Sequence, residues 1–198
     1  MNIDDLNTGD ILLFSNNKTL FERAIQYFTH SLYTHVAMVV KDPPGFPGLH
    51  IIESSREPMP DEINNRKVFG VQMQPLEAAL KTNGENVVVR KLMINRKVKQ
   101  HFTKKVFDIV KKIYAKPYDI NLLDWLRAEL RVLDPKLIWE QQDHSFWCSA
   151  LVAYIYVELG FLPKTLPWTL ISPDEWSKDN TLQFKDCFLS DIQQISSC

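Results

Sequence analysis

The chain has 198 residues, of which 45% are hydrophobic and 24% are charged, and its formal net charge is −1. These values are ordinary for a globular protein, so we expect residues 1–198 to form a single domain around one core. The even charge balance argues against a main role in binding nucleic acid or an anionic membrane. The acidic N-terminus does not resemble a secretory signal, and no apolar run approaches the roughly 20 residues that span a bilayer. We therefore expect a cytoplasmic protein without a transmembrane segment.

Strand-forming segments dominate the first half of the chain. Residues 8–15 predict a turn and then a short buried strand, and the run 33–42, rich in β-branched residues, predicts a second strand. Further strands are predicted at 49–55 and in "VFGVQMQPL" and "ENVVVRKLM". The turn sequence "DPPGFPG" between the second and third runs predicts a β-hairpin. A helical spacing of apolar residues predicts a helix at 17–31, among these strands.

The second half of the chain is predicted to be mainly helical. Segment 96–116 places five apolar side chains on one helix face, opposite a row of lysines: Phe102, Val106, Ile109, Val110 and Ile113. Pro117 is expected to end this helix. A second amphipathic helix is expected at 120–133, and a short strand within 181–189. Residues 145–160, "SFWCSALVAYIYVELG", are apolar on nearly every side, which is typical of a buried helix. Strands followed by helices indicate an α+β fold.

One of the three cysteines has a distinctive position. Cys148, Cys187 and Cys198 are odd in number and widely spaced, so they predict neither a disulfide framework nor a zinc site, and we expect no cofactor. Ser145 suits the N-cap position of the buried helix, which would place Cys148 in its first turn. Free backbone N–H groups and the helix dipole there favour a thiolate, the form that attacks carbonyl carbon. A buried free cysteine is also a common core residue, so this stretch alone leaves a structural role open.

A nucleophilic cysteine normally requires a histidine as base and a third polar group that orients the imidazole. Among the five histidines, His35 is the best candidate, because it begins the strong strand "THVAMVV". Glu53 lies on the next predicted strand. In a hairpin the two side chains can share one face of the sheet, where Glu53 would orient the ring and stabilise its charged form. The alternative for His35 is a hydrogen-bonded histidine at a sheet edge.

Six segments, taken in order, resemble a known superfamily: "LNTGDILLFSNN", "SLYTHVAMVV", "HIIESS", "KPYD", "FWCSALVAYIY" and "ISPDEW". Together they resemble the circularly permuted papain-like families of the NlpC-type superfamily, and in particular the YiiX-like branch, which has relatives in poxviruses and other large DNA viruses. The resemblance covers roughly residues 6–176. It implies an antiparallel sheet or small barrel packed on a buried, cysteine-bearing helix, with the histidine strand ahead of that helix.

The resemblance also implies an activity. The family's nucleophile matches Cys148, its histidine matches His35 and its acidic residue matches Glu53. The implied reaction is hydrolysis of an amide bond, peptide or isopeptide-like, through an acyl-enzyme. We therefore expect a thiol hydrolase with a Cys-His-Glu triad.

Three further features depend on the resemblance or on departures from it. Tyr118 matches a family tyrosine with a role in substrate or oxyanion support. Trp147 directly precedes the expected nucleophile, and it is expected either to shape the pocket or to pack below the sheet. Residues 120–142 form a segment longer than a minimal family member needs, so it is expected to be a lid or an added packing helix.

Two alternatives stay open from the sequence. The same triad would serve a lipid acyl hydrolase or acyltransferase, and aromatic residues near Cys148 suit such a substrate, although "FWCSA" differs from the "NCEHF" of the lecithin:retinol acyltransferase-like relatives. The second alternative is a binding or virion-associated protein that keeps the fold without turnover. The expected partner is a peptide-like or acyl-lipid substrate and no specific nucleic acid. Peripheral membrane contact and the oligomeric state are left open.

Overall fold

The computed structural model describes residues 1–16, 23, 26–27, 31–56, 60, 62–63, 65–83, 86–95, 101–117, 145–179 and 181–195. Most of the helix predicted at 17–31 lies outside these residues. The helix predicted at 120–133, and with it the whole segment 120–142, also lies outside them. The statements below concern the described residues.

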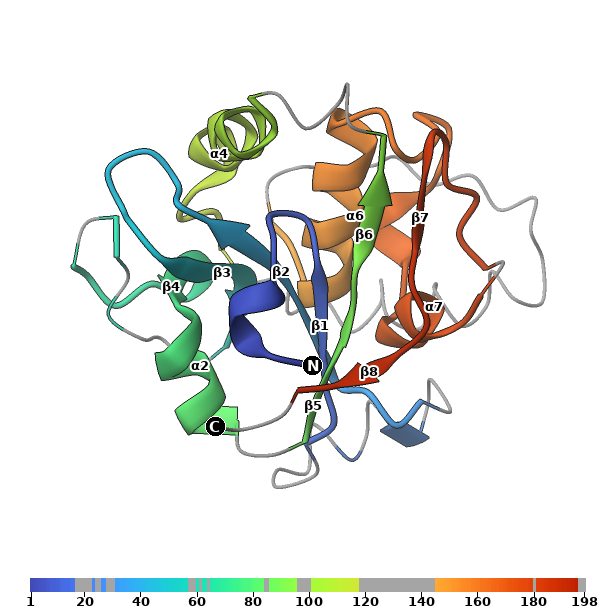
Figure 1. Ribbon diagram of the computed structural model, residues 1–198, viewed down its shortest axis with the longest axis horizontal. Helices are drawn as coiled ribbons and strands as arrows, with labels where there is room; N and C mark the ends of the chain where they lie inside the picture. Colours follow the sequence, from blue (N-terminus) through green and yellow to red (C-terminus); the bar gives the residue numbers. More distant parts are fainter. Residues whose placement is uncertain are drawn as a thin grey trace.

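An antiparallel sheet of six strands forms the centre of the molecule, in the order β4-β3-β2-β1-β5-β8 (Figure 1). Its strands are β1 (Ile11–Phe14), β2 (His35–Lys41), β3 (Leu49–Ser55), β4 (Gly70–Pro75), β5 (Val87–Arg90) and β8 (Gln193–Gln194). The predicted hairpin is confirmed, because β2 and β3 pair antiparallel with Met38 opposite Ile52. With its helices, the sheet gives the expected α+β class.

A two-stranded ribbon of β6 (Leu92–Ile94) and β7 (Cys187–Leu189) stands beside the sheet. The single strand predicted over "ENVVVRKLM" is therefore wrong, since the chain leaves the main sheet after β5. The physical reason is that side chains take the backbone N–H groups at the break. The N–H of Lys91 donates to Ser190 Oγ at 2.9 Å, and the N–H of Leu92 donates to Asp10 Oδ1 at 2.8 Å. The strand expected within 181–189 is likewise limited to β7.

The helices cover both faces of the sheet (Figure 1). They are α2 (Leu76–Asn83), α4 (Phe102–Ile113), α6 (Cys148–Glu158) and α7 (Pro173–Ser177), with 3-10 turns η1 (Ile3–Asp5) and η2 (Trp168–Leu170). Val36 and Met38 of β2 belong to the core cluster that contains α4 and α6. Ala37 and Val39, which alternate with them, belong to the second cluster with Leu76 of α2. The alternation of β2 thus divides the core into two layers.

The predicted face of α4 is confirmed, because its five expected apolar side chains are all buried. The helix ends at Ile113, before Pro117, and therefore earlier than the sequence indicated. The cause is local backbone geometry. Ala115 has a φ of 58°, and its N–H donates to the carbonyl of Val71 at 3.1 Å instead of continuing the helix.

The predicted burial of α6 is confirmed along almost its whole length. Its expected N-cap is wrong, however: Trp147 occupies that position, and Cys148 is the first helical residue. Ser145 lies too early because the chain before the helix is still extended. The N–H of Phe146 donates to the carbonyl of Pro117 at 3.1 Å, which holds this stretch against the chain that follows α4.

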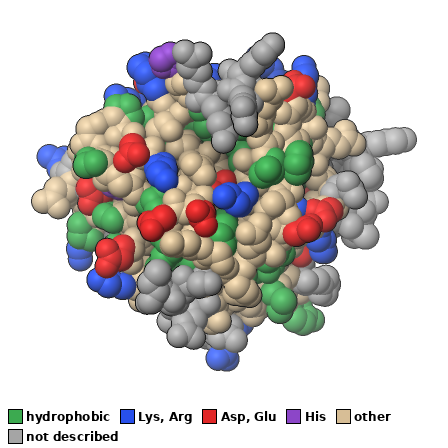
Figure 2. Space-filling model, viewed as in Figure 1, with side chains coloured by type: hydrophobic (Ala, Val, Ile, Leu, Met, Phe, Trp, Pro, Cys, Tyr) green, Lys and Arg blue, Asp and Glu red, His purple; other side chains and the backbone are tan. Residues whose placement is uncertain are grey.

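No helix in the described part of the chain is both long and apolar enough to cross a bilayer. On the face in Figure 2, basic and acidic side chains are interspersed rather than gathered into fields of one sign. This distribution agrees with the near-zero net charge of the sequence.

Candidate functional site

The pairing between β2 and β3 stops before either strand ends. Its register runs from Lys41 opposite Leu49 to Met38 opposite Ile52, and no further pair follows at the start of β2. Each strand stays attached to its other neighbour there, β2 to β1 and β3 to β4. The sheet therefore opens between β2 and β3 at one end.

The first residues of α6 are held at this opening. Continued beyond Met38 and Ile52, this register would pair Ala37 with Glu53 and then Val36 with Ser54. Instead, Ser54 Oγ donates to the carbonyl of Phe146 at 2.5 Å, and the N–H of Val36 donates to the sulfur of Cys148. A side-chain hydroxyl of β3 and a backbone N–H of β2, at positions where the two strands no longer pair, thus position the start of the cysteine helix.

His35 and Glu53 meet on the face of the sheet beside this opening. The Nε2 atom of His35 lies 2.6 Å from Oε2 of Glu53, a charge-assisted hydrogen bond. The His35 side chain is 19% exposed and the Glu53 side chain 5%. The ring of Phe14 on β1 packs against the imidazole, with centroids 5.4 Å apart. The predicted proximity of the two polar side chains is confirmed.

The second carboxylate oxygen of Glu53 accepts hydrogen bonds from two glutamines of β4. The Nε2 atom of Gln72 donates to Oε1 at 2.8 Å, and Nε2 of Gln74 donates to the same oxygen. Both glutamines are buried. The sequence reasoning predicted this strand but did not connect it with the site. The alternation in "VQMQP" was the available signal, because it places two amides on one face of an otherwise apolar strand.

Cys148 and His35 shift each other's pKa in opposite directions. Burial by itself would lower the pKa of His35, but the attraction and hydrogen bond of Cys148, together with Glu53, outweigh it and raise that pKa to about 10. Burial likewise opposes ionisation of Cys148. The charge and hydrogen bond of His35, with the N–H groups of Val36 and Ser149, nevertheless lower the pKa of the thiol. Since Nε2 is bonded to Glu53, Nδ1 is the ring nitrogen left for the sulfur.

Of the two remaining expected site residues, one lies outside the described residues and the other directly precedes Cys148. Tyr118 lies outside the described residues. Trp147 is partly buried and packs against the main core cluster, and its carbonyl accepts the N–H of Leu151 at 3.0 Å. This packing does not exclude a role in shaping a pocket, so that part of the expectation stays a prediction. Cys187 is half-buried, and burial raises the pKa of its thiol to about 12, opposite in direction to the shift of Cys148.

Within the described ranges, no group of three or more His, Cys, Asp or Glu side chains is arranged to hold a metal ion. Glu53, His35 and Cys148 contact one another in series, with the imidazole in the middle. They do not converge on one point from three sides, as metal ligands must. The described residues at the opening therefore do not form a metal centre.

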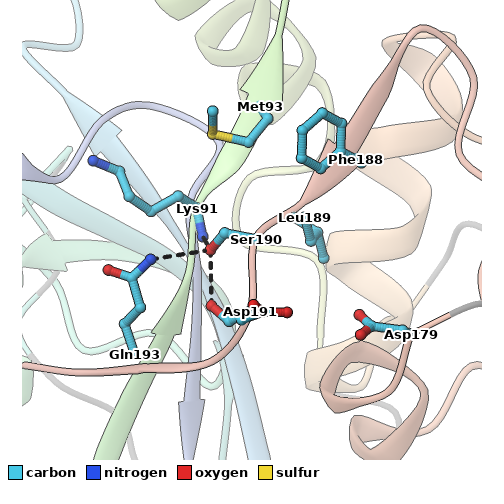
Figure 3. Close-up of a pocket in the computed structure, with 8 residues that line it drawn as sticks. All are labelled: Lys91, Met93, Asp179, Phe188, Leu189, Ser190, Asp191 and Gln193. Carbon is cyan, nitrogen blue, oxygen red and sulfur yellow. Dashed lines mark hydrogen bonds between the residues drawn. The ribbon is translucent and has the colours of Figure 1, made fainter.

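A shallow depression of about 590 Å³ lies elsewhere, over the β6–β7 ribbon (Figure 3). Its lining includes Met93 and Phe188, an opposed pair on the two strands whose exposed side chains lie next to each other. Ser190 joins the floor through hydrogen bonds with Lys91 and Gln193. Cys148, His35 and Glu53 are absent from this lining.

Comparison with known proteins supports the fold. No protein-family model and no curated protein matches the sequence. The crystal structure of the metalloprotein yiiX from Escherichia coli O157:H7 is similar, with a TM-score of 0.52 and 20% sequence identity over 96% of each chain. At this identity the likeness concerns the fold alone, and it supports a YiiX-like α+β architecture across nearly the whole chain.

Proposed function

We propose that this chain is a cysteine hydrolase with a circularly permuted papain-like, NlpC-type architecture. Cys148 is the nucleophile, His35 the acid and base, and Glu53 the group that orients the imidazole. The observation that carries the proposal is the 2.6 Å hydrogen bond between Glu53 and His35, beside a Cys148 thiol whose charge acts on the same imidazole. The pKa of the histidine is raised to about 10 and that of the thiol is lowered.

These opposite shifts favour a thiolate beside an imidazolium at neutral pH. The sulfur of Cys148 attacks the carbonyl carbon of an amide, and the N–H groups at the start of α6 stabilise the oxyanion. The Nδ1 proton of His35 passes to the leaving nitrogen, which departs as an amine and leaves a thioester on Cys148. Water, deprotonated by the now neutral His35, then attacks the thioester and releases a carboxylic acid.

The likeness to yiiX supports only the fold in this proposal. That neighbour is described as a metalloprotein. In this chain Glu53, His35 and Cys148 are arranged in series, so the proposed mechanism uses no metal ion. A peptide or isopeptide-like amide is the proposed substrate class. Acyl esters would react by the same steps, and they belong in the same assay.

The test is covalent labelling of Cys148 followed by a substrate screen. Wild-type protein and the His35→Ala variant are treated with iodoacetamide between pH 4 and 10, and labelling is mapped by peptide mass spectrometry. We expect rapid wild-type labelling well below the ordinary thiol pKa of about 8.5, and loss of that reactivity in the variant. Amide and ester substrates are then compared, with Cys148→Ala as the inactive form and Cys187→Ser as the control for an unrelated thiol.

Slow labelling of wild-type Cys148, with a pH midpoint at or above the ordinary value, would contradict the proposal. The thiol would then be a core residue at the start of a buried helix. A protein that binds without turnover would become the better description.

A further inference from the structure

We propose that Gln72 and Gln74 are positioning residues that keep Glu53 ionised and thereby fix which nitrogen of His35 faces Cys148. This inference rests on the proposed function and adds two residues to its machinery. It is carried by geometry: two buried amides from one strand donate to the carboxylate oxygen that His35 does not use.

The placement follows from strand register. Gln72 lies opposite Glu53 in the β3–β4 pairing, and Gln74 lies two residues further along β4, opposite Ile51. Side chains two residues apart share a face, so both amides reach the same carboxylate. Their neighbours Val71 and Met73 point to the other face and join the core cluster that contains α6. β4 thus contributes its apolar side to one core layer and its amides to the site.

The two amides favour the charged form of the carboxylate. An ionised carboxylate only accepts hydrogen bonds, and Glu53 receives N–H donors on both oxygens. Burial by itself would raise the pKa of Glu53, but hydrogen bonds from His35, Gln72 and Gln74, with the His35 charge, lower it. A proton on Oε1 would compete with the two donors for the lone pairs of that oxygen and weaken their hydrogen bonds.

The charge of Glu53 then decides the tautomer of His35. A carboxylate that only accepts requires Nε2 to carry a proton, so neutral His35 presents its unprotonated Nδ1 to the thiol. A neutral carboxyl group could donate to Nε2 instead. The ring proton would then lie on Nδ1, and a protonated Nδ1 could not accept a proton from Cys148. The glutamines therefore act through Glu53 on proton transfer at the sulfur.

Among the described residues, few other groups could produce the same effect. The titratable groups that shift the pKa of His35 are Cys148 on α6 and Glu53 on β3. β1 contributes the ring of Phe14, and β4 contributes the two neutral amides to Glu53. Two buried amides with only a packing role would not need to meet on one carboxylate oxygen.

The test replaces the donors while keeping side-chain size. Gln72→Met, Gln74→Met and the double variant are compared with Gln193→Met, a glutamine on β8 of the same sheet and outside the site. Iodoacetamide labelling is followed against pH and mapped at Cys148. In the double variant we expect the labelling midpoint to rise by about one pH unit, a tenfold smaller thiolate-to-thiol ratio at a given pH near the midpoint. Each single variant should show a smaller rise, and Gln193→Met none.

A measurement on the unmodified protein tests the same inference if the double variant does not fold. NMR of 15N-labelled histidine and 13C-labelled glutamate should show Glu53 ionised below pH 4.5 and a proton on Nε2 of His35 throughout. A neutral Glu53 at pH 5, or an unprotonated Nε2, would overturn it. So would a folded double variant whose labelling midpoint equals that of the wild type.

These outcomes are distinct from failure of the proposed function. If wild-type Cys148 itself labels like an ordinary thiol, the hydrolase proposal fails first. If the wild-type thiolate forms at low pH and the glutamine variants leave its midpoint unchanged, only the positioning role fails. A merely structural role would lower thermal stability in the variants without moving that midpoint.

Discussion

Replacing Glu53 with glutamine should uncouple the imidazole from the thiol while preserving the shape of the site. In Glu53→Gln the new carbonyl oxygen can still accept from Gln72 and Gln74, which leaves the new NH2 group facing Nε2 of His35. Nε2 must then accept, so neutral His35 carries its proton on Nδ1, towards Cys148. A hydrogen bond to a charged group contributes about 1.5–3 kcal/mol. At 1.36 kcal/mol per pKa unit, its loss should lower the pKa of His35 by about one to two units.

The reactivity of Cys148 reports this change. The thiolate-to-thiol ratio at neutral pH should fall about 10- to 100-fold, and the midpoint of iodoacetamide labelling should rise accordingly. The matched control is Glu77→Gln, which removes a carboxylate from an exposed i,i+4 pair with Lys81 on α2 and should leave labelling unchanged. A folded Glu53→Gln protein with wild-type labelling at every pH would refute the reasoning, because the charge of Glu53 would then have no effect on the pKa of the Cys148 thiol.

Three further predictions concern stability and the start of α6. The buried guanidinium of Arg90 donates to four backbone carbonyls of the C-terminal segment and to Asp179. Arg90→Met should therefore lower the free energy of unfolding, measured by urea titration, by about 3–5 kcal/mol. A loss below about 1 kcal/mol would contradict this prediction. Ser54→Ala removes the hydroxyl that donates to the carbonyl of Phe146. The free energy of unfolding should fall by about 1–3 kcal/mol, and labelling of Cys148 should become slower. Unchanged labelling would mean that Ser54 does not position the helix. The pKa of His35 is raised from 6.5 to about 10, so its contribution to stability is fully present below pH 6.5 and is lost as pH rises to about 10. The stability difference between wild type and His35→Gln should shrink across that window, and a constant difference would argue against the shift.

Local periodicity was sufficient to predict the parts of the fold that one segment specifies by itself. The β-branched run that begins at His35 predicted β2, and the turn after it predicted the hairpin with β3. The helical spacing of apolar residues predicted the buried face of α4 and the burial of α6. Each of these signals lies within a few turns of helix or one strand, where the period of side chains is fixed by backbone geometry. The predicted meeting of His35 with Glu53 also came from such local reasoning, because a hairpin joins them.

The boundaries were less predictable where a distant segment competes for backbone hydrogen bonds. Ser190 and Asp10 take the N–H groups that would have carried one strand through Lys91. The carbonyl of Pro117 accepts the N–H of Phe146 and holds the chain there, and Trp147 is still extended, so α6 begins at Cys148. None of these three partners is close in the sequence to the group that it binds.

By itself, then, the sequence determined an α+β chain with a histidine strand, an acidic strand and a buried cysteine helix. Only the tertiary structure decided how these meet. The opening between β2 and β3 admits the start of α6, and the register of β4 brings Gln72 and Gln74 to Glu53. The physical reason is that side-chain period is set by the local backbone, whereas strand pairing and its interruption depend on hydrogen-bond partners that only folding brings together.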